Sequence, residues 1–331
     1  MKEATAIPLS LFETATLEPP PAPLKDRLRS VEWSFSRRST LEQCPQRYYL
    51  DYYGRSKRHA PAEPEKALIR QLKLRQNRYE RTGEIVHSAI ANYFRLAQKG
   101  TIQSAKNLIH WAQRLLADDL AASRTAHAEA SGPGAAQAPL LEFSNDPKNA
   151  ETLYEEASQR MSAALQNFVE HPRYDKIRTA GRSTGAEVER MFKLSNLPCR
   201  VTGIVDFAVR ASGKPAVVDW KSGKPSQTEE DSLQLTAYAL WGAQHFGGPP
   251  DKIALYKAFL GSGSLTRFPL TQAAVDKGKR RILQDVERMI EMHSYGAQGR
   301  RRAFTPCAQS KVCILCPYLP ICPEGKESQH A

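Results

Sequence analysis

Two short apolar runs, each with an aspartate near its end, constrain this chain more than any other feature. The first is Gly203-Ile-Val-Asp206-Phe-Ala-Val, and the second, after a tight turn at 212–215, is Ala216-Val-Val-Asp219-Trp-Lys221. Such runs are typical of strands that are buried on both faces. Because side chains alternate along a strand, Asp219 and Lys221 point the same way. We therefore expect a hairpin that gathers two carboxylates and one ammonium at the edge of a sheet.

This set of charges indicates a metal site beside a basic group. A buried charge is costly unless it is paired or bound to metal, and carboxylate oxygens suit a hard divalent cation such as Mg²⁺. A divalent metal with a basic group beside it suits the hydrolysis of a phosphodiester, because the metal can activate a water molecule and stabilise charge on the phosphate. An Asp-x-Lys triplet is also common as a surface ion pair, so the two strands alone do not decide between these interpretations.

Three further segments fit the same chemistry. His87 opens a helical pattern after Thr82-Gly83-Glu84 and shares one apolar face with Ile90, Ala91 and Phe94, where it is either a ligand or a core residue. Gln234 and Tyr238 lie four residues apart on one face of a helix that is expected to begin at about Glu229. The segment 187–192 predicts another strand that leads into the hairpin.

The order of these motifs resembles the PD-(D/E)XK nuclease superfamily, and within it the RecB-like branch. The resemblance extends over about residues 34–322. It implies an α/β fold with a PD-(D/E)XK core, a central mixed sheet flanked by helices, preceded by a large N-terminal helical region. It also implies that His87, Asp206 and Asp219 ligate Mg²⁺ or Mn²⁺. Lys221 would position or activate the attacking water, and Gln234 and Tyr238 would contact DNA near the site.

The cysteines give a separate signal. Three of the six form Cys313-x2-Cys316-x5-Cys322, a spacing that favours metal ligands over disulfides in a chain without a recognisable secretory signal. Cys44, in Leu41-Glu-Gln-Cys-Pro-Gln-Arg-Tyr-Tyr-Leu, adds a resemblance to RecB-like nucleases that carry a C-terminal iron–sulfur segment, such as the AddB subunit and the CRISPR adaptation nuclease. That resemblance implies a [4Fe-4S] cluster held by Cys44, Cys313, Cys316 and Cys322.

Alternatives for the cysteines remain open. The same four thiolates suit a zinc ion, and Cys307 could replace Cys44 as the fourth ligand. Cys199, beside Pro198 on an expected strand, is interpreted as a small apolar residue. A cluster that includes Cys44 would close a loop of most of the chain and stabilise the fold by about 4–5 kcal/mol, by analogy with a disulfide. It would then be structural rather than a redox catalyst.

Composition and charge favour a nucleic-acid partner. The 331-residue chain carries a net charge of +12, which fits a polyanion. Basic residues gather in three runs, which are Arg70–Arg81, Lys277–Arg281 and Arg300–Arg302, and each is either a phosphate-contacting surface or a solvated face. The tyrosines at 48, 49, 52 and 53 either stack on single-stranded bases or, as we prefer, pack on the core. The absence of a long apolar run or signal peptide leads us to expect a cytoplasmic protein without membrane contact.

The expected domain organisation has one large unit. Residues 1–30 form a Pro-rich flexible arm, 31–325 a single RecB-like nuclease domain, and 326–331 a tail. Within the domain, 31–175 is mostly helical with a break near 58–64 and a mobile loop at 120–148. Residues 176–262 hold the catalytic sheet and helix, with strands at about 185–194, 199–210, 215–220 and 252–260. Residues 263–325 hold a helix at 272–293 and the cysteine segment.

The expected function is that of a metal-dependent DNA nuclease. The family likeness implies an exonuclease that acts on single-stranded DNA ends, leaves 5′-phosphates, and serves DNA repair, recombination, or phage or defence processing. Its partner would be a helicase, a recombination protein or a CRISPR integrase. The chain itself is not expected to be an ATP-driven helicase, because Ser222-Gly-Lys224-Pro does not match the spacing of an ATP-binding loop. The alternatives are a CRISPR adaptation nuclease that trims prespacers, and a non-catalytic DNA-binding scaffold. The presence of Asp206, Asp219 and Lys221 argues against the scaffold.

Overall fold

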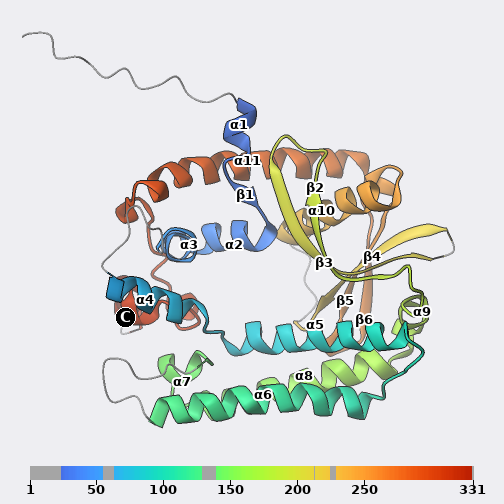
Figure 1. Cartoon of the computed structure of the whole chain (residues 1–331), viewed down its shortest axis with the longest axis horizontal. Helices are drawn as coiled ribbons and strands as arrows, with labels where there is room; N and C mark the ends of the chain where they lie inside the picture. Colours follow the sequence, from blue (N-terminus) through green and yellow to red (C-terminus); the bar gives the residue numbers. More distant parts are fainter. Residues whose placement is uncertain (1–23, 55–62, 129–138, 212, 224–228, 330–331) are drawn as a thin grey trace, which may run out of the picture.

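The computed structural model describes residues 24–54, 63–128, 139–211, 213–223 and 229–329, which form a mixed sheet with helices on both faces (Figure 1). The strands are β1 Glu32–Trp33, β2 Glu187–Leu194, β3 Arg200–Ala211, β4 Lys214–Lys221, β5 Ala254–Phe259 and β6 Ser264–Phe268. The helices are α1 Leu24–Leu28, α2 Phe35–Gln43, α3 Pro45–Tyr52, α4 Glu63–Lys73, α5 Arg78–Ala97, α6 Ala105–Ala128, α7 Glu142–Asn145, α8 Ala150–Glu170, α9 Asp175–Ala180, α10 Glu229–Phe246, α11 Gln272–Ala297, α12 Ser310–Cys313 and α13 Pro323–Glu327.

β3 is the central strand of the sheet. On one edge it pairs antiparallel with β2 along most of its length. On the other edge it pairs with two strands in turn, in parallel with β1 at Arg200 and Val201 and antiparallel with β4 from Phe207 to Ala211. β5 pairs in parallel with β4 and antiparallel with β6, so α10 is the crossover that two parallel neighbours require.

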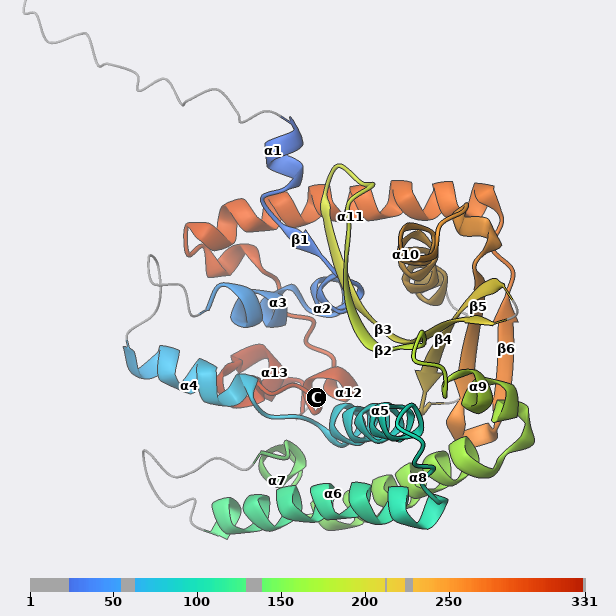
Figure 2. The same ribbon diagram turned by 45° about the vertical axis from the view of Figure 1, so that its right-hand side comes forward.

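The sheet separates two hydrophobic cores. One core joins it to α10 and α11 and includes Val201, Val205 and Leu255, with the tyrosines of α3 at its margin. The other joins it to α5, α6 and α8 and includes Phe94 and Trp220. Figures 1 and 2 show this layering, with α11 and α10 on one side of the sheet and α5 on the other, covered in turn by α6 and α8.

The expected strands and helices are confirmed, with several differences in extent. β1, β6 and α9 were not expected. The described part of the expected arm contains α1, whose Leu28 is buried in the core beside α11. The expected loop at 120–148 begins with the end of α6 and contains α7, and the Ser123 hydroxyl of α6 accepts from the Leu140 N–H. Residues 1–23, 129–138 and most of the expected break near 58–64 lie outside the described part.

The tyrosines of α3 confirm the packing interpretation. Tyr48, Tyr49 and Tyr53 are buried around Phe304, with ring centroids 5.0–6.5 Å from its ring. Tyr52 is 39% exposed, and the guanidinium of Arg37 lies 4.2 Å from its ring centroid. Three of the four rings are therefore unavailable to a nucleobase.

Candidate metal centre

The site lies where β3 and β4 separate. Their ladder ends at the pair Phe207 and Val218, one residue before the two aspartates would face each other. The next backbone N–H of β4 that points toward β3, that of Trp220, donates instead to Asp206 Oδ2 at 2.8 Å. The side chain of Asp206 thus replaces the lost ladder bond, and its other oxygen is left for the site.

β2 and β3 bend at this level. On β3, Val205 lies in the core under α10 and α11, but Phe207, two residues later, lies in the core under α5. Ala208 and Val209 continue the shifted alternation, so the two faces of β3 exchange at Asp206. On β2 the ladder skips Glu189, which stands opposite Asp206 with a backbone φ of 49°. A positive φ is unfavourable for a residue that has a Cβ, and such strain gathers at functional sites.

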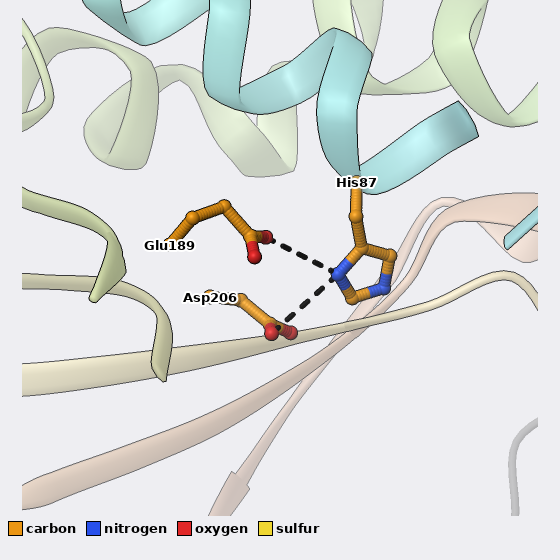
Figure 3. Close-up of side chains that lie close together, drawn as sticks. All are labelled: His87, Glu189 and Asp206. Carbon is orange, nitrogen blue, oxygen red and sulfur yellow. Dashed lines mark ion pairs between the residues drawn. The ribbon is translucent and has the colours of Figure 1, made fainter. Parts of the chain in front are cut away.

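The bend brings two carboxylates under one histidine (Figure 3). His87 Nδ1 lies 3.5 Å from Glu189 Oε1 and 3.5 Å from Asp206 Oδ1. His87 projects from α5, whose first turn is fixed by a capping box in which Asn77 accepts from the Glu80 N–H and Glu80 accepts from the Asn77 N–H. The start of the helix that carries the histidine is therefore fixed by its own cap.

The second group of expected residues forms a chain of contacts on the α10 face of the sheet. Lys221 Nζ lies 2.9 Å from Asp219 Oδ2 and donates to Gln234 Oε1 at 3.1 Å. Gln234 Nε2 in turn donates to the hydroxyl of Tyr238 at 3.0 Å. Tyr238 is only 4% exposed, so it reaches the site through Gln234.

Burial and neighbouring charge shift the pKa values of the acidic and basic groups. Burial disfavours the imidazolium of His87, but the carboxylates of Asp206 and Glu189 outweigh it and raise the pKa of His87 to about 10. Burial, reinforced by the charge of Asp206, raises the pKa of Asp219 to about 6, while Lys221 and Lys257 oppose this rise. The pKa of the Tyr238 phenol is raised mainly by burial, so it stays protonated.

The donor set fits a divalent metal. One ligand atom from each of His87, Glu189 and Asp206 can lie within 4.8 Å of the others, as in a shared coordination sphere. Two carboxylates and an imidazole suit Mn²⁺ or Mg²⁺ among the hard cations. Asp219 Oδ2 is also buried and makes no hydrogen bond of good geometry among the described residues, although Lys221 Nζ is near, so it retains lone-pair capacity for a cation.

The structure brings the expected residues together in two groups, His87 with Asp206, and Asp219 with Lys221, Gln234 and Tyr238. The charge of Asp206 acts on Asp219, which links the groups. Sequence reasoning missed Glu189 as a ligand candidate. It also missed Lys257, a lysine that is 1% exposed and stands beside Asp219 in the β4–β5 ladder. The acidic pair of residues 187 and 189 on an expected strand next to the hairpin was the available signal for Glu189.

Five of the six cysteines line one pocket between α3 and the C-terminal segment, namely Cys44, Cys307, Cys313, Cys316 and Cys322. Cys307 Sγ lies 3.8 Å from Cys313 Sγ, and burial raises the pKa of Cys316 to about 12 despite the nearby Arg47 guanidinium. Among the described residues these sulfurs do not form a group as compact as the one around His87. Cys199 is apart from them, buried at 2% exposure in the α10-side core as a small apolar residue.

Four arginines of the basic runs pair with acidic residues elsewhere in the protein. Arg78 Nη1 lies 2.9 Å from the buried Glu142, and Arg81 Nε lies 2.6 Å from Asp119. Arg281 contacts Glu42 and Asp285 at 2.7 and 3.0 Å, and Arg301 contacts Glu65 at 3.1 Å. These arginines therefore join distant segments of the fold.

The sequence profile of the PD-(D/E)XK nuclease superfamily matches residues 32–323, so the chain belongs to this superfamily. Its members are generally nucleases and typically use Mg²⁺ or Mn²⁺, in agreement with the donor group found here. A comparison with curated proteins finds no match. None of the helices in the described part of the chain has the length and apolar character that crossing a bilayer requires.

Proposed function

From its place among the PD-(D/E)XK nucleases, we propose that this protein is a metal-dependent DNA nuclease that degrades single-stranded DNA from its ends. The observation that carries the proposal is the compact group of His87, Glu189 and Asp206 beside the Asp219–Lys221 pair. Hydrolysis of a phosphodiester needs a place for a divalent cation and a cation of the protein near the attacking water. The His87–Glu189–Asp206 group and the neighbouring ammonium of Lys221 support these two roles.

His87, Glu189 and Asp206 would hold Mg²⁺ or Mn²⁺, with Asp219 as a further ligand. The bound metal would lower the pKa of a water molecule and neutralise charge on the scissile phosphate. Lys221 orients that water or stabilises the charge that develops on the phosphorus oxygens. Gln234 holds the ammonium of Lys221 through its carbonyl oxygen, and Tyr238 fixes the other end of the Gln234 amide. Tyr238 is thus a positioning residue.

The cysteine pocket supports a second part of the proposal. We assign Cys44, Cys313, Cys316 and Cys322 as ligands of a [4Fe-4S] cluster, because they line one pocket although the first precedes the others by most of the chain. The cluster would supply a crosslink between α3 and the C-terminal segment. Anaerobically purified protein should contain iron and sulfide near four each per chain. One zinc ion per colourless chain would overturn the assignment, and cluster loss in Cys307→Ser but not Cys44→Ser would replace Cys44 as the ligand.

The nuclease is tested by digestion of end-labelled linear and circular single-stranded DNA. We expect loss of linear DNA with Mg²⁺ or Mn²⁺, protection by EDTA, and survival of the circle. Digestion of the circle at the same rate would show an endonuclease. Hydrolysis in metal-free buffer, or wild-type rates in Asp219→Ala, would refute the assigned centre.

A further inference from the structure

The outer face of the β2–β3 arm exposes two large apolar side chains beside the metal centre. Met191 is 70% exposed and Ile204 is 47% exposed, and they face each other across the antiparallel ladder. Met191 follows Glu189 by two residues, and Ile204 precedes Asp206 by two. The apolar pair is therefore one step along the arm from the carboxylates that would hold the metal.

Alternation places these two side chains on the uncovered face of the arm. Phe192 and Leu194 of β2, and Val201 and Val205 of β3, turn toward the core under α10 and α11. The residues between them turn the other way. Covering these two neighbouring side chains with another apolar surface would be favourable, because it removes apolar area from water.

The same face becomes basic farther from the site. Lys193 and Arg200 are exposed, and although Glu32 of β1 is the ladder partner of Arg200, the structure records no ion pair for either cation among the described residues. Lys193 follows Met191 by two residues and Arg200 precedes Ile204 by four, which is about 13 Å along a strand. Along the arm, the candidate metal ligands Glu189 and Asp206 are thus followed by the apolar pair Met191 and Ile204, and then by the cations Lys193 and Arg200.

We propose that this face is the track for the single strand, with the base next to the scissile phosphate resting on Met191 and Ile204 and the following phosphates contacting Lys193 and Arg200. The inference rests on the proposed nuclease function and names the substrate feature that the same site selects. In a duplex the faces of the bases are covered by stacking, so an apolar pair can contact a base face only when that base is unstacked. The arm thereby favours single-stranded over paired DNA.

The proposed track is tested by measuring DNA affinity in metal-free buffer with EDTA, in which the DNA is not cleaved. The double variant Met191→Ala/Ile204→Ala should bind a fluorescent single-stranded oligonucleotide about tenfold more weakly than wild type, while its affinity for a blunt duplex is unchanged. With an oligonucleotide whose residues are abasic, wild type and double variant should bind equally. The matched control is Ile102→Ala, which removes a 49% exposed isoleucine from the α5–α6 connection.

The cations are tested by salt dependence. Lys193→Ala/Arg200→Ala should reduce the slope of log affinity against log salt for single strands by about 1.4, since each phosphate contact contributes about 0.7. Equal single-strand affinity of wild type and the Met191/Ile204 double variant, or an equal loss with abasic DNA, would overturn the track. Absence of cleavage by the wild-type protein would refute the nuclease without affecting this binding result.

Discussion

Glu189 offers the sharpest test of the centre, because its backbone and its side chain make separate predictions. Its φ of 49° places a residue with a Cβ in the left-handed region, at a cost of about 1 kcal/mol. Glycine avoids that cost, whereas in an ordinary strand it destabilises by roughly 0.5–1 kcal/mol relative to alanine. At this position the usual order should be reversed, and Glu189→Gly should be more stable than Glu189→Ala by about 1 kcal/mol.

Whether the Glu189 side chain binds metal is tested by the gain in unfolding free energy that the metal produces. A cation that binds the folded state at one hundred times its dissociation constant adds about 2.7 kcal/mol to the free energy of unfolding. Both Glu189 variants should lose most of this gain, whichever of the two is more stable in EDTA. The matched control is Glu187→Ala. Glu187 has the same 26% side-chain exposure on the same strand but pairs with His245 Nε2 at 3.1 Å on α10, away from the centre.

The measurement is urea unfolding of wild type, Glu189→Gly, Glu189→Ala and Glu187→Ala, each in EDTA and in Mn²⁺. If alanine is the more stable replacement, the left-handed backbone at 189 is refuted. If Mn²⁺ stabilises both Glu189 variants as strongly as wild type, Glu189 is not a ligand. The two results are independent, so either half of the reasoning can fail alone.

Three further predictions concern the neighbouring groups. Asp219→Ala and Lys221→Ala should abolish cleavage in a digestion assay but retain DNA binding, which rests on dispersed contacts. Asp206→Asn keeps an acceptor for the Trp220 N–H and should fold normally without binding metal. Asp206→Ala leaves that N–H without its acceptor, so its free energy of unfolding in urea should be about 1–3 kcal/mol lower than that of Asp206→Asn. In metal-free buffer the raised pKa of His87 means that its charged form stabilises the fold fully below about pH 6.5, and this contribution disappears as pH rises toward 10. His87→Ala should remove that pH dependence from the unfolding curves.

The hairpin and its charged residues were predictable from the sequence because the signal is local. An apolar run long enough to be a buried strand, with an aspartate at its end, specifies both the element and the location of its carboxylate. The two contacts of Lys221 were foreseeable on the same grounds, since Asp219 is two residues away on the same face and Gln234 lies on the following helix.

The third ligand candidate depends on tertiary structure. Glu187 and Glu189 sit two residues apart on one strand, and regular alternation would send both to the same face. Only the bend opposite Asp206 turns Glu189 toward His87 and leaves Glu187 with His245. No local pattern encodes that bend.

The pairings of the basic run before His87 were unpredictable for a similar reason. Arg78 and Arg81 are neutralised by Glu142 and Asp119, which lie 64 and 38 residues away along the chain. Those pairings depend on how α6 and α7 pack against α5. A charge count cannot reveal which cations are already occupied.

The location of the centre follows from an interruption of the sheet. A continuous β3–β4 ladder would pair every backbone group along the two strands and would leave no space between them for a cation. Ending the ladder at Phe207 frees the N–H of Trp220, which would be costly if it were unpaired, and Asp206 satisfies it with one oxygen. The other oxygen then faces His87 and Glu189, whose strained backbone belongs to the same bend. Two irregularities therefore meet at Asp206, the end of the β3–β4 ladder on one edge of β3 and the left-handed backbone of Glu189 on the other, and together they bring the side chains of the candidate centre into one place.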